Sequence, residues 1–296
     1  MLLTNCYYYD IILISSEAFS KGILKNILFF IIKYCFLIIN ILLLNNKSCR
    51  SLRREENVYM LKIENLTKSY GEKKAVDSLS LHIQKGEIYG FIGHNGAGKT
   101  TTLKAATGIL DFDGGEIYVD GVSVRKEPIV CKQKIAYIPD NPDLYEFMTG
   151  IKYLNFVSDI FGVGTAERGE RIRKYAGLFE LTASLGQPIS SYSHGMKQKL
   201  AIISALIHEP KLVIMDEPFV GLDPKAAHIL KELMREICAR GGAIFFSTHV
   251  LEVAEKLCDK VAIIKGGKLI KSGTMEDVKG DASLESVFLE LEGEDA

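Results

Sequence analysis

A single run of residues sets the architecture of this chain. It spans positions 91–101 and runs Phe91-Ile92-Gly93-His94-Asn95-Gly96-Ala97-Gly98-Lys99-Thr100-Thr101. The run fits the pattern G-x-x-x-x-G-K-[ST] with one extra central glycine. An apolar segment at residues 88–92 predicts a buried strand before it, and residues 100–107 predict the start of a helix after it. Strand, glycine-rich loop and helix in this order predict a loop whose backbone N–H groups point at a bound anion.

The side chains of the loop suit a phosphate ligand. The glycines let the backbone curl, Lys99 adds a mobile positive charge for the β- and γ-phosphates, and Thr100 supplies a hydroxyl for Mg²⁺. The alternative is a glycine-rich turn with a chance Gly-Lys-Thr, which the flanking strand and helix disfavour. We therefore expect a nucleotide to contact Gly93, Asn95, Gly96, Ala97, Gly98, Lys99, Thr100 and Thr101.

A second strand carries the chemistry that a nucleotide site needs. Residues 212–218 run Leu212-Val213-Ile214-Met215-Asp216-Glu217-Pro218, a buried strand that ends in two carboxylates. Parallel strands deliver their last side chains to one edge of the sheet, where the glycine loop also lies. We expect Asp216 to hold Mg²⁺ through water and Glu217 to polarise a water for attack on the γ-phosphate. A solvated acidic pair at a strand end is the weaker alternative.

Composition and charge narrow the class of protein. The 296 residues are 47% hydrophobic and 25% charged, which is typical of a globular core. The net charge is −1, and no basic surface indicates a nucleic-acid partner. The six cysteines form no C-x-x-C pair and no zinc-ligand spacing, so a reduced cytosolic setting is expected.

The first 59 residues differ from the rest, because positions 27–44 form a nearly unbroken apolar run. A transmembrane helix is one hypothesis, with Lys33 as its main penalty and the basic residues of 47–54 on the cytoplasmic side. A signal peptide is a poorer one, since no small-x-small cleavage site follows. The hypothesis that we favour is an open reading frame extended upstream of a true start at Met60, and a native peptide from residues 33–47 would refute it.

From Met60 onward, periodicity predicts an α/β domain. Residues 61–70, 79–83 and 116–119 alternate as half-buried antiparallel strands do, and residues 135–138 form a short buried strand. Between about 141 and 195 the period becomes helical, which predicts an inserted subdomain. A helix over 196–208, a strand over 212–215, a helix over 225–240 and a strand over 243–247 follow.

These motifs, in this order over residues 60–280, resemble the ATP-binding subunits of ABC transporters. Tyr70 stands where that family places an aromatic ring against adenine. Ser193-His194-Gly195-Met196 resembles the family's signature motif, in which a hydroxyl, a glycine backbone and a helix N-terminus bind the phosphate of ATP held by the other protomer. Gly221-Leu222-Asp223-Pro224 resembles the loop that crosses the dimer interface. His249, after Ser247 and Thr248, resembles the switch histidine at the γ-phosphate.

Two positions depart from the family pattern. Asp140 stands where a glutamine usually contacts Mg²⁺ and senses the membrane partner; a carboxylate still reaches a metal, but as a charge. The signature is Tyr192-Ser193-His194-Gly195-Met196, and Ser193 and Gly195 are the positions that we expect to contact phosphate. Both departures resemble the ABC-2-type and bacitracin-exporter-like branch.

The resemblance implies a P-loop NTPase (RecA-like) core with an antiparallel β subdomain and an inserted α-helical subdomain. It implies ATP and Mg²⁺ as ligands, with Lys99, Glu217 and His249 as catalytic residues and Thr100, Asp140 and Asp216 at the metal.

The resemblance also implies partners and a place in the cell. Two such chains, identical or different, would sandwich ATP and drive a separate membrane permease at the cytoplasmic face of the cell membrane, with a single-pass anchor if residues 1–59 are translated. Docking by a short helix near residues 141–149 is expected. The short acidic tail after residue 280 favours export. A translation or DNA-repair relative would need a second P-loop or a long coiled coil, and a GTPase would need N-K-x-D; none occurs.

Overall fold

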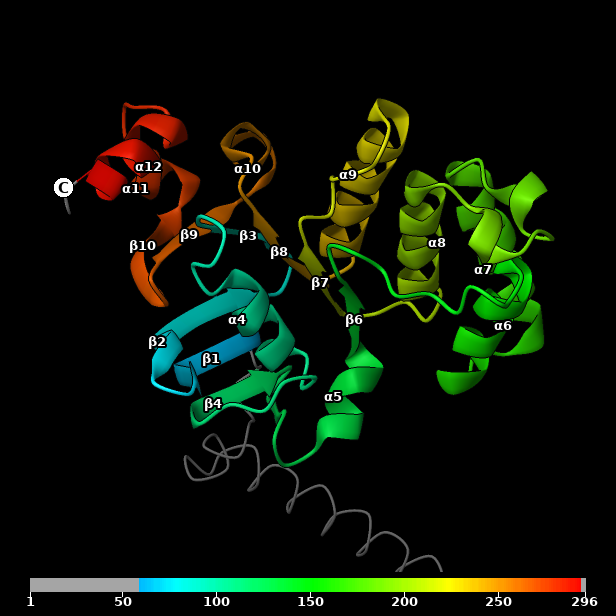
Figure 1. The fold of residues 1–296 in the computed structure, drawn as a ribbon, viewed down its shortest axis with the longest axis horizontal. Coiled ribbons are helices and arrows are strands. Elements are labelled where there is room, and N and C mark those ends of the chain that lie inside the picture. The colour runs from blue at the N-terminus through cyan, green and yellow to red at the C-terminus, as the bar shows by residue number, and fades with distance from the viewer. Residues whose placement is uncertain (1–58, 294–296) are drawn as a thin grey trace, which may run out of the picture. The chain divides into compact units, whose positions relative to one another are not determined.

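The structure is a computed structural model that describes residues 59–293 (Figure 1). The hypotheses about the apolar run at 27–44 and about the true start concern residues that lie outside this range. No helix within residues 59–293 is long and apolar enough to cross a membrane.

A six-stranded sheet forms the centre of the domain, in the order β10-β9-β3-β8-β7-β6. All neighbouring pairs are parallel except β9 and β10. The carboxyl ends of its parallel strands therefore meet at one edge, as the sequence predicts. The strands are β3 (Ile88–Ile92), β6 (Ile135–Ile138), β7 (Leu212–Asp216), β8 (Ala243–Thr248), β9 (Lys260–Lys265) and β10 (Lys268–Thr274).

A second, antiparallel sheet has the order β2-β1-β4-β5. Strand β2 is longer than the expected residues 79–83. The sequence pattern shows only its second part, because register shifts interrupt the β1–β2 pairing and Ser78 has a positive φ of 53°. Such bulges break the strict alternation by which a strand is recognised in sequence. The strands are β1 (Tyr59–Tyr70), β2 (Lys73–Gln84), β4 (Gly114–Val119) and β5 (Val122–Ser123).

Helices cover both faces of the six-stranded sheet and create two cores (Figure 1). On one face Phe91 and Phe245 pack with α4 (Lys99–Ala106), α5 (Pro128–Lys134) and the antiparallel sheet. On the other face Phe246 belongs to a core built with three helices: α8 (His194–Leu206), α9 (Pro224–Ala239) and α10 (Leu251–Leu257). Alternate residues of β8 thus pack in opposite cores, which is why the strand is continuously apolar from Ala243 to Phe246.

The helical insert lies at one end of the sheet, beyond β6 (Figure 1). Its main helices are α6 (Gly150–Ile160) and α7 (Thr165–Leu178). Thr149 caps α6 by accepting a hydrogen bond from the Lys152 amide at 3.4 Å. Residues 141–149 themselves contain no helix, so the surface near them is an irregular loop.

The chain ends in two helices that pack on the domain. They are α11 (Met275–Lys279) and α12 (Leu284–Gly293). Leu284, Val287 and Phe288 of α12 are buried in the core that contains α10. The Phe288 ring lies 5.0 Å from the ring of His94, in the glycine loop. Part of the acidic tail is therefore continuous with the domain.

Candidate active site

The glycine loop follows β3 and has the backbone that an anion cradle requires. Gly96 and Gly98 have positive φ values of 80° and 108°, which side-chain-bearing residues rarely adopt. A Cβ at Gly98 would lie 2.4 Å from the Ala75 carbonyl oxygen, and one at Gly93 would lie 2.5 Å from that of Ile264. Glycine is thus required at Gly93 and Gly98 by close packing, and the loop brings its N–H groups to the start of α4.

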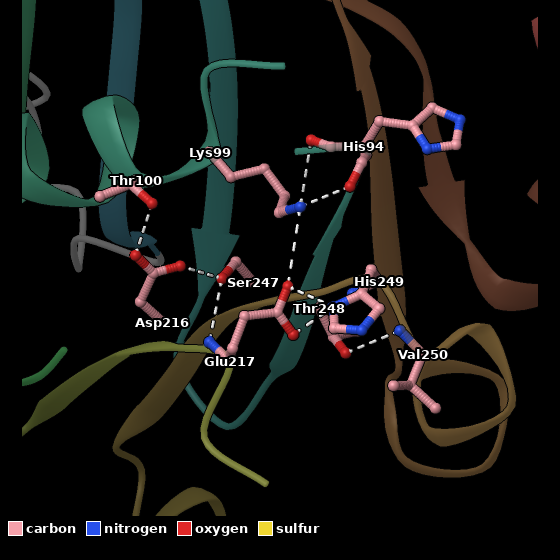
Figure 2. A network of polar contacts seen from close by, with 10 residues as sticks. His94, Lys99, Thr100, Asp216, Glu217, Ser247, Thr248, His249 and Val250 are labelled. Carbon is pink, nitrogen blue, oxygen red and sulfur yellow. Dashed lines mark hydrogen bonds and ion pairs between the residues drawn. The ribbon is translucent and has the colours of Figure 1, made fainter. Parts of the chain in front are cut away.

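Lys99 is buried and is held inside the loop (Figure 2). Its ammonium donates to the carbonyl oxygens of Gly93 and, at 3.3 Å, of His94. Nζ also lies 3.7 Å from Glu217 Oε1. The ammonium of Lys99 therefore interacts with both the loop carbonyls and Glu217. A phosphate could replace these partners of the ammonium.

Asp216, at the end of β7, connects the loop to the sheet (Figure 2). Thr100 donates from Oγ1 to Asp216 Oδ2 at 2.6 Å, and Ser247 donates from Oγ to the other carboxylate oxygen. A hydroxyl and a carboxylate at this distance are the hard oxygen ligands that Mg²⁺ prefers, so these residues fit the metal that the fold family implies. The sequence analysis did not assign Ser247 to the site, because only the Asp216–Ser247 strand register places the two side by side.

Glu217 has an unusual backbone and lies beside His249. Its φ is 47°, in the left-handed region, and its amide N–H is shared by the carbonyl and the Oγ of Ser247, both at 3.2 Å. The Oε1 atom lies 2.9 Å from His249 Nδ1, and the His249 amide donates to Oε2 at 3.4 Å. The carboxylate is thus aimed between Lys99 and His249, where it can accept a proton from a water (Figure 2).

Most of the predicted residues line one cavity of about 460 Å³. Gly93 and Ala97 belong to the glycine loop but do not line the cavity, and His249 is beside Glu217 without lining the cavity. Lys73, Lys104, Tyr137 and Asn141 line it and had not been assigned to the site. The predicted residues that line it are Tyr70, Asn95, Gly96, Gly98, Lys99, Thr100, Thr101, Asp140, Asp216 and Glu217.

Tyr70 and Asp140 are exposed members of the cavity wall. The Tyr70 side chain is 54% exposed, and Lys68 Nζ lies 5.5 Å from the centre of its ring. A flat exposed ring at the wall offers a stacking surface to a base. Asp140 follows β6 and is also exposed.

The signature residues lie outside this cavity. Ser193 is exposed and caps α8 by accepting from the Met196 amide at 3.3 Å. A Cβ at Gly195 would lie 2.9 Å from the Gly221 carbonyl oxygen, so the signature packs against the loop before α9.

Asp223 caps α9, accepting from the Ala226 amide at 2.8 Å, and lies 2.6 Å from Lys199 Nζ. The hydrogen bond from Lys199, and then that from Ala226, lowers the pKa of Asp223. This aspartate has a structural role within its own chain and does not reach the cavity.

Comparison with known proteins identifies the family. The sequence profile of ABC transporters matches residues 76–220. The linearmycin resistance ATP-binding protein LnrL of Bacillus subtilis (strain 168) is 36% identical over 219 residues, covering 74% of this chain and 70% of the relative. The ABC-type transporter ATP-binding protein EcsA of the same organism is 34% identical over 242 residues, covering 80% of this chain and 98% of the relative.

Comparison with solved structures indicates the same family. The ATP-binding subunit of an ABC transporter matches with a TM-score of 0.76 and 35% identity, over 79% of this chain and 99% of the matched chain. The predicted resemblance and the predicted α/β P-loop fold are both confirmed. This chain belongs to the ABC transporter family, as an ATP-binding subunit that is an ATPase.

Proposed function

We propose that this chain is the Mg²⁺-dependent motor of an exporter and works as a head-to-tail dimer on a separate membrane subunit. One observation carries the proposal: Ser193 and Gly195 do not line the cavity that contains Lys99, Asp216 and Glu217. A nucleotide in that cavity leaves the signature of its own chain unused. A second ATP-binding chain, identical or different, can supply the missing signature.

Each residue in or beside the cavity has a separate role in ATP hydrolysis. Lys99 exchanges its loop carbonyls for the β- and γ-phosphates, which hold its charge more strongly. Glu217 accepts a proton from the attacking water, and His249 orients the carboxylate and contacts the γ-phosphate. Mg²⁺, held by Thr100 and Asp216, would neutralise charge on the phosphate oxygens. Tyr70 would stack on adenine, and Asp140 would help to hold the metal with a carboxylate in place of an amide.

Closure of the dimer is the power stroke in this proposal. Ser193 and Gly195 of one chain present a hydroxyl and a backbone N–H to the γ-phosphate bound by the other chain. The loop that contains Asp223 crosses the interface. Cleavage of the γ-phosphate removes these contacts and reopens the dimer, as in other switches that a γ-phosphate orders.

The membrane subunit docks on an aromatic patch formed by Tyr145, Phe147 and Phe156. The ring of Tyr145 lies 5.9 Å from that of Phe147 and 5.6 Å from that of Phe156. Phe147 is 82% exposed, and neighbouring exposed apolar side chains favour a partner protein over water. The patch joins the loop after Asp140 to α6, so a partner bound there can sense the nucleotide site. Docking there would place the chain at the cytoplasmic face of the cell membrane.

Export is the direction that we favour. The relative LnrL is named for resistance to linearmycin, an effect that removal of a compound from the cell would produce. Transport assays in inverted vesicles that contain the membrane subunit decide the direction: ATP-dependent accumulation supports export, and its absence with uptake in right-side-out vesicles contradicts it.

The central test replaces Glu217 by glutamine, which keeps the shape and removes the base. Glu217→Gln should bind ATP with little change, hydrolyse it at least about a hundredfold more slowly, and accumulate as an ATP-bound dimer in size-exclusion chromatography. Lys99→Ala should instead lose ATP affinity. Unimpaired turnover by Glu217→Gln would exclude Glu217 as the base, and a monomer at saturating ATP would count against the dimer.

A further inference from the structure

Tyr137 is a member of the nucleotide cavity that the proposed mechanism leaves without a task. It is the third residue of β6 and pairs with Ile214 of β7, two residues before Asp216. Its ring packs on the core that contains the antiparallel sheet, and its side chain lines the cavity together with Asp140. The strand therefore places Tyr137 between this core and the wall of the cavity.

The hydroxyl of Tyr137 is buried and has no hydrogen-bond partner among residues 59–293. A buried phenol without a partner is unfavourable, so such groups usually serve a ligand or a moving side chain. Burial, and then the charges of Asp216 and Asp140, raise the pKa of Tyr137. The hydroxyl thus remains protonated and can act as a hydrogen-bond donor.

Of Asp216 and Asp140, only Asp140 has no hydrogen-bond donor among residues 59–293, so it is the acceptor that gains most from the phenol. Asp216 already receives hydrogen bonds from Thr100 and Ser247 on its two oxygens. Asp140 is exposed and makes no hydrogen bond or ion pair with any residue that the structure describes. It lies three residues after Tyr137, at the end of the same strand, and both line the cavity.

We propose that Tyr137 is a positioning residue: when Asp140 turns into the cavity, the phenol O–H donates to its carboxylate and holds it beside the metal. The inference rests on the proposed function, in which Asp140 stands next to Mg²⁺. It assigns a partner to the substituted position, because a carboxylate, unlike an amide, has no donor of its own and needs one to fix its orientation. Tyr137 then acts through Asp140 and does not touch the nucleotide.

The test is a double-mutant cycle with Tyr137→Phe and Asp140→Ala in the full chain, since alanine leaves no acceptor for the phenol. Tyr137→Phe deletes one oxygen and keeps the ring that packs on the core. For each variant we would measure the affinity for a non-hydrolysable ATP analogue, with Mn²⁺ and with a chelator instead of metal. Tyr175→Phe is the matched control, because this tyrosine lies on α7 and does not line the cavity.

Tyr137→Phe should weaken binding with Mn²⁺ about tenfold, as expected for a hydrogen bond to a charged group, and leave binding without metal unchanged. In the Asp140→Ala background the same change should have no further effect on binding with Mn²⁺. Tyr175→Phe should match the unsubstituted chain.

Three results would overturn the inference: equal weakening with and without metal, full additivity of the two substitutions, or unchanged affinity in Tyr137→Phe. If the unsubstituted chain itself fails to bind the analogue better with Mn²⁺, the proposed function is at fault. If it does bind better and Tyr137→Phe behaves identically, only the inference about Tyr137 fails.

Discussion

Ser247 holds both acidic residues of the site at once. Its hydroxyl donates to Asp216 and accepts from the Glu217 amide, and its side chain is completely buried. A hydroxyl is suited to this position because it can donate and accept together. Loss of this hydroxyl would therefore change the orientation of Asp216, the proposed metal ligand, and of Glu217, the proposed base, without removing either side chain.

We expect Ser247→Ala to lower kcat about tenfold, because a hydrogen bond to a charged carboxylate contributes about 1.5–3 kcal/mol and part of it will be replaced by water. ATP affinity should change by less than about threefold, since the loop and Lys99 are untouched. Steady-state hydrolysis and equilibrium ATP binding measure the two effects.

The control is Ser204→Ala, another buried serine, whose hydroxyl donates to the Ala201 carbonyl within α8. It should leave kcat unchanged. A Ser247→Ala protein with full kcat would show that the Asp216 orientation does not depend on Ser247.

At the scale of elements, Asp120 joins the two sheets. It lies in the turn after β4, and its carboxylate is within 3.0 Å of both Lys85 and Lys134 and 3.4 Å of Lys211. These lysines come from the turn after β2, from α5 and from the segment before β7. One carboxylate thus connects the antiparallel sheet to the edge of the central sheet opposite the nucleotide.

Asp120→Asn should lower the free energy of unfolding by about 1–2 kcal/mol near neutral pH. Burial alone would raise the pKa of Asp120, but hydrogen bonds from Lys134 and Lys85 outweigh it and lower the pKa to about 2. Because the folded pKa lies below the unfolded one, the stabilisation is complete above about pH 4 and is lost as the pH falls towards 2.

Urea unfolding as a function of pH checks this sign. The difference between the two proteins should be constant near neutral pH and shrink below about pH 4. Asp111→Asn, an exposed aspartate without an ion pair among residues 59–293, should change the free energy of unfolding by less than about 0.5 kcal/mol. A difference that grows on acidification would contradict the role of Asp120.

The elements also show what sequence patterns predict and what they miss. Strands β3, β6, β7 and β8 and helix α9 were predicted to within about two residues, because continuous apolar runs and helical periods are strong local signals, whereas β9 and β10 were not predicted. The first part of β2 was missed because a bulge at Ser78 breaks the alternation. The packing of α12 was not predicted, because its sequence is short and acidic. Its three buried apolar residues pack in a core formed by segments that are distant in the sequence.

In the site, too, local sequence motifs were predicted, whereas residues placed by long-range contacts were not. The loop and the carboxylate pair were predicted because each is contiguous in sequence. Ser247 and Tyr137 were not assigned to the site, since strand register and side-chain facing place them there. Their position depends on which strands pair, and that is decided by contacts between segments distant in the sequence.

At the scale of the whole molecule, the proposed composite site requires contact between two chains. Ser193→Arg adds bulk and charge to the signature, outside the cavity of its own chain. Combined with Glu217→Gln, it should abolish the ATP-dependent dimer and leave ATP binding by the monomer within about threefold, because Lys99 and the loop are unchanged.

Size-exclusion chromatography at saturating ATP, with parallel binding titrations, measures both properties. The matched variant is Ser191→Arg, also exposed and only two residues away, in the same Glu217→Gln background. It should still dimerise. If the Ser193→Arg combination dimerises as well as Glu217→Gln alone, the signature does not lie at the interface.

The left-handed backbone of Glu217 has a consequence for heat resistance. A non-glycine residue in this conformation costs about 1 kcal/mol or more, whereas glycine adopts it freely. Glu217→Gly should therefore melt about 2–4 °C above Glu217→Ala in calorimetry, although glycine is usually the less stable of the two in regular structure. Equal or reversed melting temperatures would refute the strain. If the order holds, the chain keeps at the position of the proposed base a residue that thermal stability alone would disfavour.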